Sequence, residues 1–154
     1  MHYLIAILIA CLFGTACSGT DSCLKDVAAE NFSVSISKGM CFGKCPVYKG
    51  TVWGDGRVTY EGQQNVERLG TFSGVISQED LCKLVTQVRE RKLVQLDTSY
   101  IDNVPDAPVT TITITDKGRS KTFSWNMGSP EPLRELGSRM VNATFENKKM
   151  KRQP

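Results

Sequence analysis

Two cysteines separated by three residues, Cys41 and Cys45 in GMCFGKCPVYKG (39–50), have the types and spacing to do chemistry. Such a pair can form a disulfide, exchange electrons with other thiols, or supply two ligands to zinc. We favour a structural disulfide, because Gly43 lets the loop turn and Pro46 restricts φ where the chain enters the next segment. The chain-entropy model assigns a five-residue loop about 2 kcal/mol of stabilisation.

The redox and metal alternatives for this pair fit the sequence less well, but both remain open. The active-site pair of thioredoxin-like proteins is C-x-x-C at the start of a helix, whereas a strand pattern follows Cys45. Zinc would require Cys23 and Cys82 as ligands as well. We expect no metal and no cofactor, and we favour pairing of Cys23 with Cys82, although Cys82 could simply be a small buried residue.

The chain has one histidine, His2, which falls in the predicted signal peptide described below. Its absence from the rest of the chain excludes Ser-His-Asp and Cys-His nucleophilic catalysis and every zinc site that uses imidazole. Catalysis by paired carboxylates remains the third of our hypotheses. The 16 acidic residues contain no pair that the sequence alone singles out for this role.

The N-terminal region carries an export pattern. Residues 3–14, YLIAILIACLFG, form an uncharged apolar run. A membrane-spanning helix needs about 20 residues, so this run is too short to be one, but its length is typical of a signal peptide. Small residues and Cys17 follow, which resembles the lipobox of bacterial lipoproteins, whose cysteine carries the lipid. Gly14 stands where that motif usually has leucine, and no Lys or Arg precedes the run. The alternative lipidation site is Cys11.

These observations predict four segments. They are a lipoprotein-type signal peptide over 1–16, a lipidated tether over 17–30, a single domain over 31–146 and a basic tail over 147–154. The net charge of +3 arises in the tail, since the rest of the chain has more acidic than basic residues, and we therefore expect no nucleic-acid partner. We expect the tail to be a solvated, disordered end, with contact to an anionic surface as the alternative.

Hydrophobic periodicity predicts the elements of the domain. Alternation indicates strands at 32–37, 46–53, 57–62, 67–76, 109–115 and 119–125, and apolar residues at helical spacing indicate helices over 77–93 and 128–145. Ser77 with Asp80 and Ser129 with Pro130 are the expected helix starts. The order β-β-β-β-α-β-β-α predicts an α+β fold, with a mainly antiparallel sheet of about six strands and both helices on one face.

Four sequence blocks resemble those of a family of bacterial envelope domains of unknown function, numbered 6438. They are CFGKCPVY (41–48), GDGRVTYEG (54–62), DAP (106–108) and MGSPEPLREL (127–136), and the similarity extends over about residues 32–141. The resemblance implies an exported α+β domain that is often lipid-anchored. It implies no activity, because none is established for the family.

Our first hypothesis is a lipid-anchored domain of the bacterial cell envelope, facing the periplasm or the exterior. It would be held to the membrane by the N-terminal lipid and would bind an unknown protein or cell-wall partner without catalysis. The second is an envelope thiol-redox or metal-handling protein that uses Cys41 and Cys45. The candidate partner-binding residues are Phe42, Lys44, Tyr48 and Asp106. Asp106 belongs to a long loop that is either functional or a simple connector.

Overall fold

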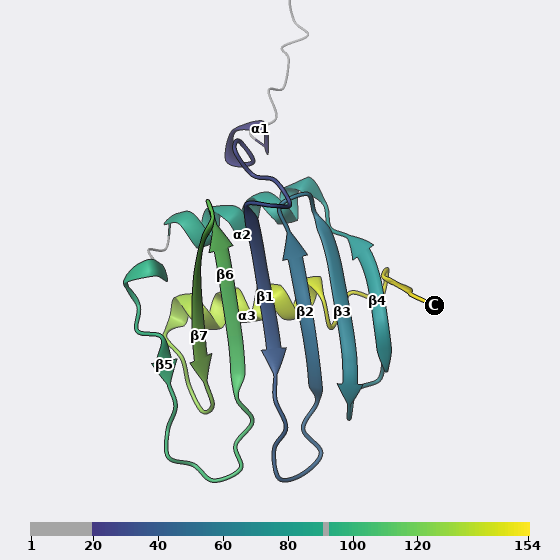
Figure 1. The fold of residues 1–154 in the computed structure, drawn as a ribbon, viewed down its shortest axis with the longest axis vertical. Coiled ribbons are helices and arrows are strands. Elements are labelled where there is room, and N and C mark those ends of the chain that lie inside the picture. Colours follow the sequence, from purple (N-terminus) through teal and green to yellow (C-terminus); the bar gives the residue numbers. More distant parts are fainter. Residues whose placement is uncertain (1–19, 91–92) are drawn as a thin grey trace, which may run out of the picture.

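The computed structural model describes residues 20–90 and 93–154. The predicted signal peptide and the predicted lipidation site at Cys17 therefore lie outside the described residues. Figure 1 shows one twisted sheet with two helices packed behind it. Within the described ranges, no helix has the length and apolar character needed to cross a membrane.

The sheet has eight strands in the order β5-β7-β6-β1-β2-β3-β4-β8. Six of them carry most of the pairing: β1 (Phe32–Lys38), β2 (Val47–Trp53), β3 (Arg57–Gln64), β4 (Gly70–Val75), β6 (Thr110–Asp116) and β7 (Arg119–Trp125). The two edge strands, β5 (Ser99–Tyr100) and β8 (Lys151–Arg152), have two residues each. All pairs are antiparallel except β5 with β7. The predicted fold class is confirmed, and the strand number exceeds the prediction because a two-residue strand is too short to show alternation.

The helices are α1 (Thr20–Cys23), α2 (Gln78–Glu90), the short 3₁₀ helix η1 (Leu93–Gln95) and α3 (Glu131–Ala143). Helices α2 and α3 cover the same face of the sheet, as predicted (Figure 1). The predicted start of α2 is confirmed: Ser77 Oγ accepts a hydrogen bond from the Asp80 N–H at 3.1 Å and donates one to the Asp80 carboxylate at 2.7 Å. The predicted cap at Ser129 is wrong, since α3 begins after Pro130 without a side-chain capping bond.

The hydrophobic core lies between the sheet and the two helices. Alternate residues of the central strands face it, for example Phe32, Val34 and Ile36 of β1, which are almost fully buried. Helix α2 contributes Leu84 and α3 contributes Met140, and both are buried as well. This arrangement follows from the two periodicities in the sequence, because only one face of the strands and one stripe of each helix is apolar.

The other face of the sheet is polar and is rich in serine and threonine. Hydroxyl pairs join β6 to β7 across this face at 2.8–3.2 Å, namely Thr111 with Ser124, Thr113 with Thr122 and Thr115 with Ser120. A face of this kind is typical of an antiparallel sheet with one side exposed to solvent. The polar residues that alternate with the buried ones thus account for this surface.

The C-terminal residues are part of the fold. Strand β8 pairs with β4, Met150 is buried, and the Gln153 N–H donates to the Thr71 carbonyl at 2.9 Å. The Arg68 guanidinium donates hydrogen bonds to three carbonyl oxygens at 2.5–3.0 Å and so holds the chain where it leaves α3; the acceptors are Thr144, Phe145 and Asn147. The disordered tail predicted from residue 147 is therefore corrected, because edge pairing and burial of Met150 order this segment.

The two ends of the sheet are built differently. At the end that α1 approaches, the α1 end, short turns join β2 to β3 and β6 to β7, and Gly56 and Gly118 adopt φ values of +82° and +73° there. These positive values are accessible to glycine at low cost, which allows the short turns of both hairpins. At the opposite end, the loop end, three longer connections meet: residues 39–46, 101–109 and 126–130 (Figure 1).

Candidate functional site

The first feature of the loop end is the disulfide between Cys41 and Cys45, whose Cα atoms lie 5.8 Å apart. Within the closed loop, the Gly43 N–H donates to the Cys41 carbonyl at 2.9 Å, so the turn occurs at the glycine. The Asn65 side chain donates to the Cys45 carbonyl at 3.1 Å and ties this loop to the connection between β3 and β4. The pair therefore closes a turn directly before β2, as the sequence predicted.

Hydrogen bonds join the three connections of the loop end to one another. The Gly39 N–H donates to the Val109 carbonyl at 2.9 Å and the Phe42 N–H to the Asp106 carbonyl at 3.3 Å, which links residues 39–46 to 101–109. The Asn126 side chain exchanges two hydrogen bonds with the Asp102 backbone, at 2.7 and 2.9 Å, which links 101–109 to 126–130. These bonds restrain the three loops of the loop end relative to one another.

The side chains on this surface are unusually apolar for exposed loops. Phe42 is 90% exposed. Six of the eight exposed large hydrophobic residues in the described part of the chain belong to the three connections: Met40, Phe42, Ile101, Val104, Val109 and Met127. A seventh, Leu69, lies between β3 and β4 at the same end of the sheet, whereas Val75 lies at the α1 end. Exposed apolar surface that gathers in one place indicates an interaction site.

The four candidate partner-binding residues do not all lie on this surface. Phe42 and Lys44 are exposed at the tip of the disulfide loop, and Asp106 is exposed on the neighbouring loop, where its carbonyl receives the Phe42 N–H. Tyr48 differs from the prediction. The residue is 6% exposed, and its ring stacks on Phe145 with the ring centroids 4.9 Å apart. Burial raises the pKa of Tyr48, and the residue contributes to packing rather than to a surface.

Five exposed residues of the loop end were absent from the sequence-based prediction: Met40, Ile101, Val104, Val109 and Met127. Four of them fall between the predicted elements, whereas Val109 was expected at the start of the strand over 109–115. Such residues are hard to interpret from sequence, because an apolar loop residue can equally fold inward and complete a core. Only the structure shows that these side chains point to solvent from three separate segments.

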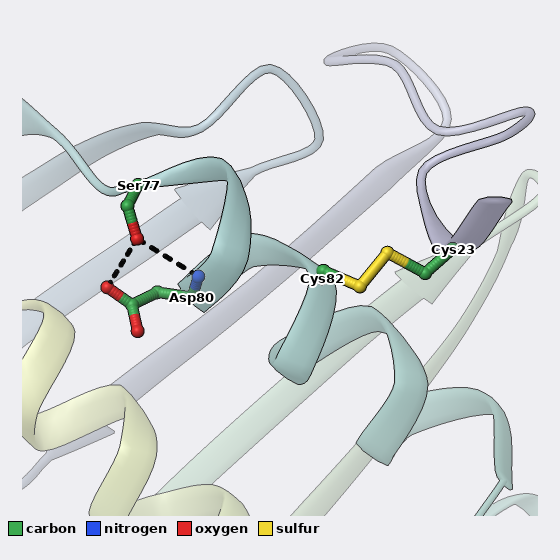
Figure 2. Close-up of a disulfide and its surroundings, with 4 residues drawn as sticks. All are labelled: Cys23, Ser77, Asp80 and Cys82. Atoms are coloured by element: carbon green, nitrogen blue, oxygen red, sulfur yellow. Dashed lines mark hydrogen bonds between the residues drawn. A yellow bond between two sulfur atoms is a disulfide. The ribbon is translucent and has the colours of Figure 1, made fainter. Parts of the chain in front are cut away.

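The second disulfide joins Cys23 of α1 to Cys82 of α2, with the Cα atoms 5.6 Å apart. Figure 2 shows that Cys82 follows the Ser77–Asp80 cap by less than one helical turn, so the bridge attaches the N-terminal segment to a well-defined helix start. The pairing that the sequence favoured is present. It fixes α1 at the end of the sheet opposite to the exposed apolar loops (Figure 1).

The cysteine arrangement bears on the redox and metal hypotheses. The two disulfides lie at opposite ends of the sheet, so the four cysteines cannot bind one zinc ion together. From Cys45 the chain continues through Pro46 into β2, whereas thiols in redox motifs usually gain reactivity from a following helix. No group of three or more His, Cys, Asp or Glu side chains suited to a metal ion occurs in residues 20–90 and 93–154.

A concave surface also lies on the helical side of the molecule. It is a groove of about 1160 Å³ between α2, α3 and residues 146–149, with Leu84 and Met140 among its apolar residues. Asp80 and Arg139 illustrate that charges of both signs line it. Mixed charge over an apolar floor does not indicate one class of ligand, so we do not take this groove as the candidate site.

A family model described as Domain of unknown function (DUF6438) matches residues 32–144. The matched segment begins with the first residue of β1 and ends directly after α3, so it includes the disulfide loop and the central sheet. Cys23 lies outside it, and the bridge to Cys82 therefore connects the matched domain to the segment that precedes it. No curated protein matches the chain.

Proposed function

The chain belongs to the DUF6438 family, whose model covers most of its length, and we propose that it is a lipid-anchored binding module of the bacterial cell envelope without catalytic activity. The single observation that carries this proposal is the difference between the two ends of the molecule. A covalently fixed N-terminal segment lies at one end of the sheet, and most of the exposed large hydrophobic residues of the described chain lie in the loops at the other. That arrangement suits a domain attached at one end and bound to a partner at the other.

The anchor rests on sequence features outside the described residues. The apolar run over 3–14 and the small residues before Cys17 support export and lipidation, and two disulfides suit an oxidising compartment. Acyl chains bind membranes by burying apolar carbons, each worth about 0.8 kcal/mol, so a multiply acylated Cys17 would be retained stably. The compartment would be the periplasm or the cell exterior.

The binding role rests on the chemistry of the loop end. Its cysteines form a bridge, its exposed groups are mostly apolar, and the candidate residues that remain there are Phe42, Lys44 and Asp106. These groups can recognise a surface but do not form a constellation that activates a nucleophile. The unknown protein or cell-wall partner would therefore be bound rather than converted.

Membrane fractionation tests the anchor. Cys17→Ser should move the exported full chain from the membrane fraction to the soluble envelope fraction. Cys11→Ser is the matched control, because it changes the alternative lipidation cysteine, which lies within the apolar run, and it should leave the chain at the membrane. Retention of the Cys17→Ser variant would contradict the proposal, and release of the Cys11→Ser variant instead would move the anchor to Cys11.

The reduction potential of Cys41–Cys45 tests the non-catalytic role. A structural bridge in an exported protein should have a potential below about −300 mV. A value between about −270 and −120 mV, where thiol-exchange proteins lie, would favour the alternative of an envelope thiol-redox protein. The measurement is equilibration of the purified protein with thiol buffers, and Cys23–Cys82 serves as the internal comparison.

A further inference from the structure

We propose that the loop end docks into an apolar pocket of a protein partner, with Phe42 as the inserted side chain, on the side of the domain that faces away from the anchoring membrane. The inference deepens the proposed function and rests on it, because the direction of the loop end is deduced from a lipid on Cys17. It specifies which surface binds, which residue leads and what kind of partner it fits.

Phe42 has the properties of an interface anchor. The residue is 90% exposed, although its backbone is held by the Cys41–Cys45 bridge and by the hydrogen bond to Asp106. A ring on a restrained loop loses little conformational freedom on binding, and large aromatic side chains dominate the energetics of many interfaces. The disulfide thus holds a large apolar group outside the fold, where it contributes nothing to the core.

The surroundings of Phe42 extend this surface. Met40 lies on the same loop, Val104 on the second connection and Met127 on the third, and all three side chains are exposed. Methionine is flexible and polarizable, so it adapts to the wall of a partner's pocket at low cost. The surface is made of protruding loop tips, and its complement is therefore a concave site.

The geometry of the anchor argues against insertion of the loop end into the same membrane. Five residues separate Cys17 from Cys23, so the chain between them reaches about 20 Å at most. The Cys23–Cys82 bridge holds Cys23 at the α1 end. The strands add further distance, since a seven-residue strand such as β1 spans about 23 Å. A lipid on Cys17 would keep the α1 end near the membrane and leave the loop end facing away from it.

The charged residues of the loop end further restrict the kind of partner that can bind there. The loops 39–46 and 101–109 carry two exposed acids, Asp102 and Asp106, and one exposed base, Lys44. Two copies that met symmetrically at their loop ends would bring these acids close to one another, which disfavours self-association. A partner with an apolar pocket and basic groups on its rim would complement both features.

Site-specific photocrosslinking in cells that export the full chain tests the proposal. A benzophenone amino acid replaces Phe42 or Met127 at the loop end, or Val75 at the α1 end as a control. Val75 is a suitable control because it is a large apolar residue and is 71% exposed. Positions 42 and 127 should give an adduct with the same protein, and position 75 should not.

Titration of the captured protein with the purified full chain then measures the role of the ring. Phe42→Ala should weaken binding by about 30-fold or more, the loss expected for an interface anchor. Val75→Ala should change it by less than about 2-fold. Equal thermal stability of both variants and the wild type shows that any lost affinity reflects lost contact rather than lost folding.

Several results would overturn the inference: an adduct with lipid, an adduct with a second copy of the chain, equal protein adducts from positions 42 and 75, or unchanged affinity of Phe42→Ala.

The exported Cys17→Ser variant separates this inference from the anchor. If Cys17→Ser stays at the membrane while position 42 still captures the protein, the lipid at Cys17 and the orientation deduced from it fail and the docking surface stands. If Cys17→Ser is released and position 42 captures no protein, the docking surface fails and the anchor stands.

Discussion

The two disulfides have nearly equal Cα–Cα separations, 5.6 Å for Cys23–Cys82 and 5.8 Å for Cys41–Cys45, yet they constrain the chain very differently. The first joins residues 59 apart in sequence and the second joins residues 4 apart. In the chain-entropy model the longer loop is worth about 4 kcal/mol and the shorter about 2 kcal/mol. One bridge therefore restrains the topology of the chain, and the other shapes a local surface.

The regions around the two bridges also differ: one packs on the core and the other is exposed to solvent. Cys82 belongs to a capped helix that packs on the core, and the turns at its end of the sheet are short. Cys41 and Cys45 close a loop whose largest side chain, Phe42, points into solvent. In the function proposed above, the α1 end would serve stability and attachment and the loop end would serve contact with a partner. The following predictions test that division.

The largest effect on stability should come from the bridge at the α1 end. Cys23→Ser with Cys82→Ser should lower the free energy of unfolding by about 4 kcal/mol, because the unfolded chain regains the freedom of a long loop. Urea denaturation followed by circular dichroism measures this. A loss no larger than that of the Cys41–Cys45 double variant would show that loop length does not govern the difference between the two bridges.

A large loss should also follow removal of the buried aromatic ring next to the disulfide loop. Tyr48→Ala should destabilise the protein by about 3 kcal/mol, since it leaves a cavity beside Phe145 and Tyr60. Phe42→Ala is the matched control six residues away and should change stability by less than about 0.5 kcal/mol. Similar losses for both variants in chemical denaturation would remove the distinction between core and contact surface.

The bridge at the loop end should have a smaller effect on stability and a larger one on local order. Cys41→Ser with Cys45→Ser should cost about 2 kcal/mol. Amide hydrogen exchange should accelerate at Phe42, whose N–H is bonded to the Asp106 carbonyl, while amides of β1 stay protected. Acceleration that spreads evenly over β1 and β6 would mean that this bridge supports the whole sheet.

The smallest effect concerns the turn between β2 and β3 at the α1 end. The Arg57 guanidinium donates a hydrogen bond to Asp55 and holds the pKa of this carboxyl below its usual value. A lowered pKa stabilises the fold above the unfolded value of about 4, and this stabilisation is lost as the pH falls through the folded pKa. Both side chains are more than a third exposed, so Asp55→Asn should cost only about 0.5 kcal/mol at pH 7.

Denaturation of the wild type and the Asp55→Asn variant across the acid range measures this contribution. Their stabilities should converge below the folded pKa of Asp55, where the wild-type carboxyl is protonated. A difference that persists there would show that the substitution acts through the turn backbone rather than through charge.

Most of the fold could be predicted from the sequence, because its elements are long enough to show a period. The alternation of Phe32, Val34 and Ile36 with serines and the helical spacing of Leu81, Leu84, Val85 and Val88 both survive in the structure. The failures have local causes. Ser129 does not cap α3, and the edge strands β5 and β8 depend on pairing partners that are distant in sequence.

The candidate site was less predictable than the fold. Phe42 and Tyr48 belong to the same sequence block and are both aromatic, but one is exposed and the other buried. Their difference depends on the position of Phe145, which lies almost a hundred residues later in the chain and stacks on Tyr48. Local sequence contains no signal for such a contact, so Tyr48 was placed among the candidate partner-binding residues although it packs in the core.

The sequence by itself determined the α+β class, the order of the main elements, the lack of histidine after residue 2 and the even set of four cysteines after Cys17. These properties follow from composition and short-range periodicity. The tertiary structure decided which end of the sheet carries α1, which exposed apolar residues gather at the other end, and that residues 147–153 belong to the domain. The physical reason is that these features depend on contacts between segments far apart in the chain, and such contacts form only when the sheet brings the segments together.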